Sequence, residues 1–339
     1  MITLKDIAKE CGVSFSTVSK ALQGSSEISI EKIKLIQSKA EEMGYHPNIA
    51  ARTLRTNKTY DLGVIFEDKT GTGLQHQYFA KILSGFQEAA QKYNYDITFT
   101  GASNNTDYDY YKHIMGRSID GIAILSADFK RQDLQKIVSS GLPLVTLDYI
   151  YDEKHLAVLS NNVQGMQELT SYVISMGHKK IAMIHGEDTL VTRERKSIFS
   201  KILKEKGITV PPEYFVQAQY YNSQISKEAT EKLLSLPEPP TCIFFPDDFS
   251  ALGGITALHE KGLTPGKDIS IVGYDGILLS SMLVPPLTTY EQNGYEIGKT
   301  MANLLINQIE KKSNPQDNAI LINGKLLTGG TVQDLNSGR

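Results

Sequence analysis

The chain has 339 residues, of which 22% are charged and 40% are hydrophobic, and its net charge is −3. This length suffices for two or three domains with buried cores, and the composition is that of an ordinary globular protein. No run of about 18 apolar residues is present, which argues against a transmembrane helix. The charged N-terminal sequence MITLKDIAKE predicts no secretory signal. The two cysteines, Cys11 and Cys242, favour a reducing cytoplasm over a disulfide framework.

The charge is divided unevenly along the chain. Residues 1–58 contain nine lysines and arginines and six acidic residues, a net charge of +3, which leaves −6 for the remainder. A mildly basic head on an acidic body is typical of a DNA-binding module attached to a larger domain.

The stretch Thr3–Leu22, TLKDIAKECGVSFSTVSKAL, predicts two short helices joined by a tight turn. Thr3 and Asp6 have the spacing of a capping box at the start of the first helix. Ala8 allows a close helix crossing, Gly12 tolerates a left-handed backbone in the turn, and Val18 anchors the second helix. The pattern therefore predicts a helix-turn-helix, with an ordinary helical hairpin as the alternative.

A third helix and a linker follow. Ser29 is positioned to cap a helix whose apolar residues recur at helical spacing from Ile30 to Met43. The next segment, Ile49–Thr59, favours helix but is short and basic. We expect it to be marginal alone and to fold against a partner.

The sequences TLKDIAKECGVSFSTVSKAL, MGYHPN and AARTLR resemble the LacI/GalR family of bacterial transcriptional regulators, and the resemblance continues through the body. It implies that the second helix enters the major groove of DNA, where Phe15, Ser16 and Lys20 match base-reading positions. Lysine can donate to guanine, serine can donate or accept, and an aromatic edge can pack on a thymine methyl. The alternatives are a Phe15 packed in the core and a solvated Lys20.

The same resemblance assigns further DNA contacts. Thr17 and Ser19 are placed near phosphates, and in the linker Asn48, Ala51, Arg52 and Leu54 match DNA-contacting positions. Leu54 corresponds to a leucine wedged into the minor groove, where unstacking a base step is offset by the contacts that a bend allows. The alternative is a Leu54 that packs against the body.

From Leu62 onward, β-like runs alternate with helix-like segments. LGVIF, YDITFTG, GIAILS and LPLVTLD are the first runs, and AVLS is expected to open a second, similar series ending in ISIVGYD. This alternation predicts α/β architecture: two Rossmann-like lobes with parallel sheets, like a periplasmic binding protein, and a cleft at the carboxyl ends of the strands. The family resemblance implies that the later segments cross back between the lobes, so the expected divisions are a head at 1–47, a linker at 48–60, a first lobe at 61–158 and 292–318, and a second lobe at 159–291 and 319–335.

The body carries no recognisable catalytic constellation. The nearest dinucleotide-binding fingerprint, at residues 71–76, has His76 in place of its last glycine. The seven histidines show no metal-binding spacing, and no nucleophile elbow is present. We therefore expect no enzyme activity, no cofactor and no metal.

Carboxylates recur at the ends of apolar runs: Asp148 after LPLVTL, Asp247 after IFFP and Asp275 after ISIVGY. At the carboxyl ends of parallel strands they would face one cleft, where their paired acceptor oxygens suit the hydroxyls of a sugar. The alternative for each is helix capping. This excess of acid would repel a phosphorylated or carboxylated effector, and we expect a neutral carbohydrate rather than a nucleobase or a sugar phosphate.

The family resemblance adds further effector contacts. Arg195 matches an effector-binding arginine, although Ile198 stands where the family motif has glycine. His76 and Phe79 align with contacts after the first strand, and Tyr149 and Tyr220 are candidates to stack on a pyranose ring.

The sequence therefore predicts a cytoplasmic, sugar-responsive regulator of transcription, most simply a repressor. A homodimer would present two heads to a palindromic operator. The rival interpretations are a solute-binding protein without a regulatory role and a nucleotide-dependent enzyme.

Overall fold

The computed structural model describes residues 2–22, 25, 27–45, 53, 58–67, 72–100, 108–312 and 317–336. The chain divides into two compact units, a head of residues 1–59 and a body of residues 60–339. Within the described residues, no helix combines the length and apolar character needed to cross a membrane.

The head is a bundle of three helices: α1 (Leu4–Glu10), α2 (Phe15–Leu22) and α3 (Ile30–Glu42). Its small core is built from residues that recur at helical spacing on the three inner faces, namely Ile7, Ala8, Val18, Ala21, Ile36 and Ala40. Thr3 and Asp6 form the capping box that their spacing predicts. The expected helix-turn-helix and third helix are therefore confirmed.

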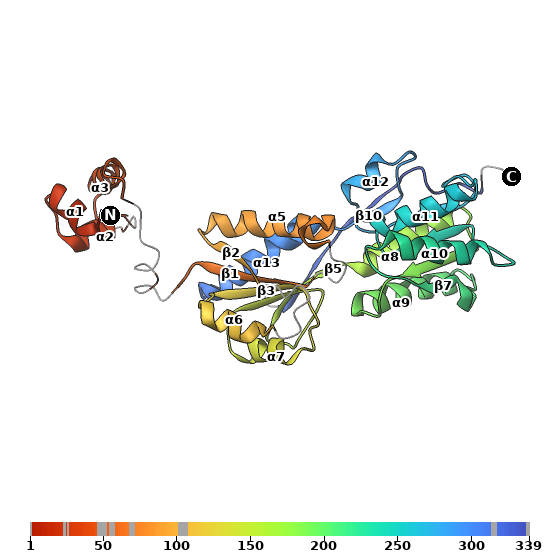
Figure 1. Ribbon diagram of the computed structural model, residues 1–339, viewed down its shortest axis with the longest axis horizontal. Coiled ribbons are helices and arrows are strands. Elements are labelled where there is room, and N and C mark those ends of the chain that lie inside the picture. The colour runs from red at the N-terminus through yellow and green to blue at the C-terminus, as the bar shows by residue number, and fades with distance from the viewer. Residues whose placement is uncertain are drawn as a thin grey trace. The chain divides into compact units, whose positions relative to one another are not determined.

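The first lobe of the body is a six-stranded parallel sheet with the strand order β11-β5-β4-β3-β1-β2. Its strands are β1 (Asp61–Phe66), β2 (Asp96–Thr100), β3 (Gly121–Ser126), β4 (Leu144–Leu147), β5 (Leu156–Ser160) and β11 (Ala319–Ile322). Helices α5 (Gln77–Lys92) and α13 (Gly294–Ile309) cover one face of the sheet. A short 3-10 turn, η1 (Gly73–Gln75), precedes α5. Helices α6 (Tyr110–Arg117) and α7 (Gln132–Ser139) cover the other face (Figure 1). The nearly continuous burial of β1, β3 and β4 is what a sheet covered on both faces requires.

The second lobe repeats this architecture with a four-stranded parallel sheet in the order β7-β6-β8-β9. The strands are β6 (Ile181–His185), β7 (Phe215–Gln217), β8 (Cys242–Phe244) and β9 (Ser270–Val272), with a 3-10 turn η2 (Pro212–Tyr214) before β7. Helices α8 (Asn162–Ser175) and α9 (Leu190–Glu205) pack on one face, and α10 (Ser223–Leu234) and α11 (Asp248–Glu260) on the other (Figure 1). A short α12 (Leu278–Met282) and the antiparallel pair β10 (Thr289–Glu291) and β12 (Lys325–Leu327) complete the lobe.

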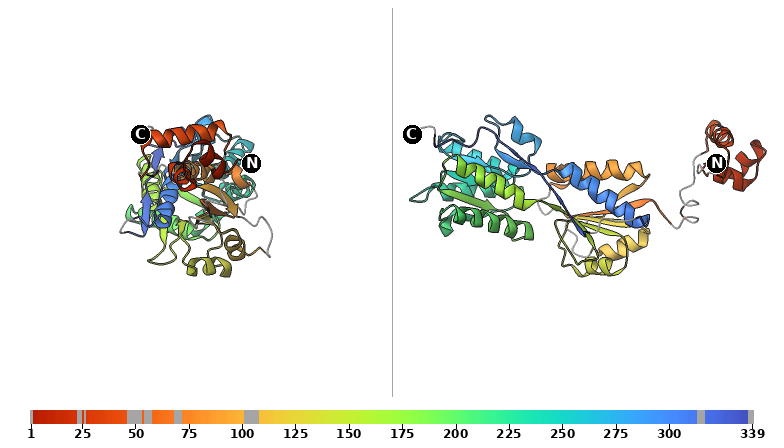
Figure 2. Two further views of the ribbon diagram at one scale, coloured as in Figure 1. Left: turned by 90° about the vertical axis from the view of Figure 1, so that its left-hand side faces the viewer. Right: turned by 180° about the vertical axis from the view of Figure 1, so that it is seen from behind.

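The chain crosses between the lobes three times: after β5, after β10 and between β11 and β12 (Figure 2). The crossings are bonded to one another. The Asn161 backbone N–H donates to Ile322 O at 3.0 Å, its side-chain Nδ2 donates to Asn323 Oδ1 at 2.8 Å, and Gly324 N–H donates to the Tyr290 hydroxyl at 2.8 Å. The lobes therefore share a hinge of three linked segments.

Two strands belong to a different lobe from the one expected. The AVLS run lies in β5, which pairs with β4 in the first sheet, and residues 319–322 form β11, which pairs with β5. The first lobe therefore includes residues 159–160 and 319–322, which the expected boundaries assigned to the second. The pattern of apolar residues gives a strand, but its partner is decided by long-range pairing.

Helices α5 and α13 approach to backbone contact because glycines face the partner helix. A Cβ atom at Gly85 would lie 2.0 Å from Tyr295 O, and one at Gly298 would lie 1.8 Å from Ile82 O. The pair forms much of the first lobe's core. It also positions the residues of α5 that face the cleft.

Candidate functional site

The head presents the N-terminal part of α2 to solvent. Gly12 adopts a left-handed conformation with φ of +62° in the turn, as the sequence predicts. The Ser14 hydroxyl accepts from Thr17 N–H at 3.1 Å and so caps α2. Phe15, 51% exposed, lies outside the head's core, while Val18 and Ala21 on the opposite face are fully buried.

The candidate base-reading residues therefore share an accessible surface of α2. Ser16 and Lys20 are exposed, and Thr17 and Ser19 are half-buried. The Lys20 ammonium donates to Glu27, so this lysine is held by a neighbouring carboxylate in the free head. Asn48, Ala51, Arg52 and Leu54 lie outside the described residues.

The body contains a cavity of about 570 Å³ lined by residues of both lobes. All eight side chains expected to contact an effector line it: His76, Phe79, Asp148, Tyr149, Arg195, Tyr220, Asp247 and Asp275. Residues far apart in the sequence meet here because the carboxyl ends of parallel strands share one edge of each sheet.

Asp148 and Asp275 reach the cavity from unusual backbone conformations. Their φ angles are +51° and +109°, and Gly276 follows at +62°. Positive φ in a non-glycine residue is costly and concentrates at functional sites. The Asp148 carboxylate accepts from Ser160 through its N–H at 2.6 Å and its hydroxyl at 3.1 Å. Among the described residues, the Asp275 carboxylate accepts only from Gln292 Nε2, at 2.6 Å to Oδ1, which leaves Oδ2 for a ligand.

Asp247 caps a helix in addition to lining the cavity. One oxygen accepts from Ser250 N–H at 2.7 Å, and the other accepts from the Ser250 hydroxyl and from Tyr221 N–H at 2.8 Å each. The capping alternative is therefore realised at this residue. Its charge still acts on the cavity, but both oxygens already have partners.

Burial raises the pKa of all three aspartates. For Asp275, burial and then the nearby Asp247 carboxylate raise the pKa to about 7. The Asp275 carboxyl therefore exchanges its proton near neutral pH.

Arg195 on α9 is the buried cation of the site, with 8% of its surface exposed. Its Nε donates to Asn162 Oδ1 at 2.8 Å and its Nη1 donates to Pro246 O at 3.2 Å, while the guanidinium lies 3.6 Å over the Tyr274 ring. Nη2 has no hydrogen bond among the described residues and is available to a ligand. Ile198 packs beside the core that contains Phe199, so α9 continues without the glycine of the family motif.

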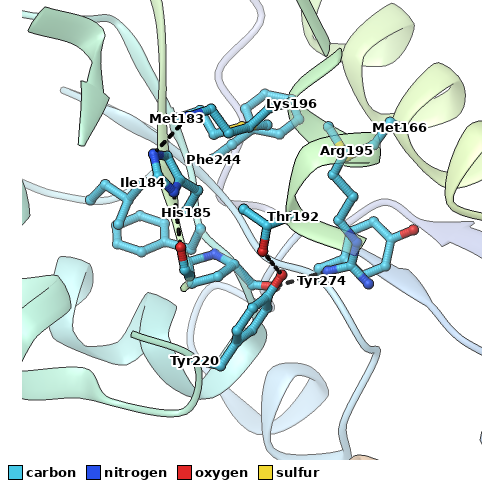
Figure 3. A pocket seen from close by; sticks show the side chains of 13 residues that line it. Met166, Met183, Ile184, His185, Thr192, Arg195, Lys196, Tyr220, Phe244 and Tyr274 are labelled. Atoms are coloured by element: carbon cyan, nitrogen blue, oxygen red, sulfur yellow. Dashed lines mark hydrogen bonds between the residues drawn. The ribbon is translucent and has the colours of Figure 1, made fainter. Parts of the chain in front are cut away.

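A small pocket of about 20 Å³ lies beside Arg195 (Figure 3). Tyr220 extends over it, and its hydroxyl is 2.8 Å from Thr192 Oγ1. A Cβ at Gly186 would lie 2.2 Å from the Tyr220 ring, so this glycine allows the ring to lie flat on the end of β6. Tyr220 and Arg195 line both the small pocket and the main cavity.

An aromatic stack crosses the cleft. The His76 ring of the first lobe lies 3.9 Å from the Tyr221 ring of the second at an interplanar angle of 23°, and Tyr221 stacks on Phe249 at 4.3 Å. Phe79 packs on the edge of His76, with a centroid distance of 4.8 Å. His76 therefore joins the lobes as well as lining the cavity.

Asn162, Gln292 and Phe129 are relevant residues that the sequence analysis did not select. Asn162 orients Arg195, Gln292 donates to Asp275, and Phe129 lines the cavity. Asn162 and Gln292 each follow the end of a strand, the signal that identified the aspartates. Phe129 is a single aromatic residue in a loop, and no sequence pattern marks it.

The described part of the chain holds no group of three or more histidine, cysteine or acidic residues arranged to bind a metal ion. His178, one of the seven histidines, is buried between structural partners, with Nδ1 2.8 Å from Thr241 Oγ1 and Nε2 3.1 Å from Gln333 O. The site is thus a polar, aromatic-lined cleft suited to binding an organic molecule.

The chain is similar to known regulators along its whole length. The model of bacterial regulatory proteins, lacI family, matches residues 3–48, and that of the periplasmic binding protein-like domain matches residues 170–332. The probable HTH-type transcriptional repressor ExuR of Bacillus subtilis (strain 168) is 33% identical over 340 residues, which cover 99% of each chain.

Solved structures share the fold. The Lac repressor dimer bound to operator and the anti-inducer ONPF is 22% identical, with a TM-score of 0.82 over 98% of this chain and 99% of that one. The transcriptional regulator CelR–cellobiose complex is also 22% identical, with a TM-score of 0.73 over 98% of this chain and 100% of that one.

Proposed function

Because this chain belongs to the lacI family of bacterial regulatory proteins, we propose that it is a repressor whose affinity for its operator is set by a carbohydrate bound between the lobes. The observation that carries this proposal is the joint placement of Arg195 and three strand-end aspartates around one cavity. The family establishes sequence-specific DNA binding and regulation of transcription. Binding in the cleft, with no catalytic step, is the role proposed for the body.

For operator recognition, we assign base contacts to Phe15, Ser16 and Lys20 and phosphate contacts to Thr17 and Ser19. Their accessibility on α2, opposite the buried Val18, supports this assignment. Lys20 must exchange its bond with Glu27 for one to a base edge. Asn48, Ala51, Arg52 and Leu54 keep their assigned roles in the linker as proposals.

The charge around the cavity favours a neutral effector. Its lining includes seven carboxylates, from Glu67, Asp128, Asp148, Glu187, Asp188, Asp247 and Asp275, against three cations, Lys130, Arg193 and Arg195. Arg193 and Asp188 pair with each other, with bonds of 2.7 and 2.6 Å, which leaves six carboxylates against Lys130 and Arg195. An anionic ligand would meet net repulsion, whereas sugar hydroxyls can donate to these oxygens. The cellobiose held by a structure of the same fold is consistent with this class.

We propose that the protein acts as a homodimer in the cytoplasm, where two heads would engage a palindromic operator. Exposed apolar residues near α12 support a self-association surface: Leu278 is 63% exposed, Met282 65% and Val284 96%. Met282→Asp should shift the protein toward monomer in analytical ultracentrifugation. Dimerisation that is unchanged by this substitution would place the interface elsewhere.

The central experiment combines operator selection with effector screening. Selection from random duplex DNA should return a palindromic site, and a thermal-shift screen against mono- and oligosaccharides should find a ligand that stabilises the body by mass action. Failure to select any DNA would favour the solute-binding alternative, and nucleotide turnover would favour the enzyme.

Two substitutions separate the two sites once operator and effector are known. Lys20→Ala should reduce discrimination among bases at one operator position by roughly 1–3 kcal/mol without changing effector binding. Asp275→Ala should abolish the effector response while leaving operator affinity nearly unchanged. A normal effector response in Asp275→Ala, measured by fluorescence anisotropy on labelled operator, would contradict the cleft assignment.

A further inference from the structure

The cavity has more room than one sugar ring requires. A hexose built of roughly six CHOH groups, each about the 30 Å³ of a water molecule, occupies on the order of 180 Å³. The cavity volume is about 570 Å³. A single ring at Arg195 and Asp275 would leave most of this cavity unfilled. The residues that line the unfilled part therefore indicate how large the effector is.

Two lining residues, Phe129 and Tyr149, belong to an aromatic wall, defined here as Phe129, Tyr149 and Tyr151, in the loops after β3 and β4. The Phe129 and Tyr149 rings are parallel, with centroids 4.2 Å apart and an interplanar angle of 1°. Tyr151 meets both edge-on, at 4.9 Å from Tyr149 and 6.0 Å from Phe129. Phe129 and Tyr149 line the cavity, whereas Phe129 and Tyr151 also pack on the first lobe's core.

Hydrogen bonds fix the wall in place. Phe129 O accepts from the Tyr151 hydroxyl at 3.2 Å and from Gln135 Nε2 at 3.0 Å, and Tyr149 O accepts from the Thr146 hydroxyl. These bonds hold the backbone that carries the rings, and the rings pack on one another, so less entropy is lost when a ligand binds.

Polar groups accompany the wall. Glu67, Asp128 and Lys130 line the cavity from the same lobe. The Glu67 carboxylate is held by the Tyr110 hydroxyl at 2.8 Å, by Asp128 N–H at 3.2 Å and by Arg131 Nη1 at 3.3 Å. A flat apolar surface beside fixed acceptors matches a pyranose, which presents an apolar face and a rim of hydroxyls.

We propose that the effector contains at least two linked sugar rings, one bound by Arg195 and Asp275 and the next stacked on the face of Phe129 that Tyr149 does not cover. This inference rests on the proposed carbohydrate-binding function and narrows its ligand class to di- or oligosaccharides. Phe129 is its specificity-determining residue, because it offers the flat surface that a second ring requires.

Isothermal titration calorimetry on the full chain tests this proposal with three series of probes: glucose, maltose and maltotriose; glucose, cellobiose and cellotriose; and xylose, xylobiose and xylotriose. In at least one series the disaccharide should bind about tenfold more tightly than its monosaccharide, a difference of about 1.4 kcal/mol. Phe129→Ala should remove most of this preference and leave monosaccharide affinity within about twofold, whereas Phe129→Tyr should retain it.

Phe129→Leu keeps the packing volume without the flat face, so it serves if the alanine variant folds poorly. A ratio of disaccharide to monosaccharide affinity that is unchanged in both Phe129→Ala and Phe129→Leu overturns the proposal. Equal binding of mono- and disaccharide by the unaltered chain overturns it as well and leaves the proposed function standing. If none of these saccharides binds a chain that still binds operator DNA, the carbohydrate assignment itself fails.

Discussion

At the scale of single residues, the environment of the Asp275 carboxyl group is unfavourable for its ionised form. Asp275 is 6% exposed, has a φ of +109° and lies near Asp247, yet it has one hydrogen-bond donor among the described residues. Such a group destabilises the ligand-free body when it is ionised, and a ligand that donates hydrogen bonds offsets that cost.

Asp275→Asn should therefore stabilise the ligand-free protein in a pH-dependent manner. Because the folded-state pKa, about 7, lies above the ordinary value of 3.8, the folded chain retains a proton that the unfolded chain has lost between these values. The free energy of unfolding contributed by Asp275 is fully present below pH 3.8 and is lost as pH rises toward 7. In the unaltered chain this loss of unfolding free energy amounts to about 1.36 kcal/mol per pKa unit. The Asp275→Asn variant has no carboxyl group at this position and should not show the loss.

Urea denaturation at pH 5 and pH 8 measures this difference. The advantage of Asp275→Asn over the unaltered chain should be larger at pH 8, by an amount on the order of a few kcal/mol. Glu153→Gln, which neutralises an exposed carboxylate, is the control and should show no such trend. An advantage of Asp275→Asn that is equal at both pH values would show that Asp275 does not titrate in this range.

At the scale of elements, the α5–α13 pair is the closest helix contact described in the first lobe and forms much of its core. Gly85 and Gly298 allow the two helices to touch through their backbones. Helix α5 also donates from Lys81 Nζ to Gly276 O, directly after Asp275, at 2.9 Å. This bond links the segment that follows Asp275 to the α5–α13 pair.

Gly298→Ala should separate these helices and lower the free energy of unfolding by about 1–3 kcal/mol, because its Cβ would meet the Ile82 backbone. Gly116→Ala on α6 is the matched control: its Cβ would have no neighbour within 4 Å, and the change should be neutral or stabilising by up to about 1 kcal/mol. Thermal unfolding of both variants decides the matter. Equal melting temperatures for the two would show that the α5–α13 contact is easily relaxed.

Strand patterns in the sequence predicted these elements well but not all of their neighbours. Apolar runs ending in Asp148, Asp247 and Asp275 placed three carboxylates at the cleft, since parallel strands end at a common edge. The same reasoning put the AVLS run of β5 in the wrong lobe, because pairing such as Val145 with Leu156 leaves no local trace. Phe129 was not identified for a similar reason: its role depends on Tyr149, twenty residues away in the sequence.

At the scale of the whole body, the ligand-free lobes are already joined across the cleft. The His76–Tyr221–Phe249 stack and the bond from Lys81 to Gly276 O link residues of opposite lobes. Each aromatic pair contributes about 0.5–1.5 kcal/mol beyond its buried area. These contacts bias the body toward closure before an effector binds.

Tyr221→Ala should shift the ligand-free body toward an open form, by about tenfold in population for the loss of roughly 1.4 kcal/mol. Small-angle X-ray scattering should then show a larger radius of gyration that falls on addition of effector. Tyr221→Phe keeps the ring and removes the hydroxyl, whose bond to Gln75 O is long at 3.4 Å, so its radius of gyration should stay close to that of the unaltered chain. Identical radii for all three ligand-free proteins would mean that the stack does not control closure.

The three bonded crossings between the lobes limit how the body can move. Because the segments are tied together through Asn161, Ile322, Asn323 and Gly324, we expect the lobes to swing about a common axis and to resist sliding and twisting. The effect of any ligand on the body is then described by a single variable, the angle between the lobes. Two chemically different ligands that produce the same angle between the lobes would change operator affinity by the same amount. A tightly bound ligand that holds the lobes apart would act as an antagonist of the effector.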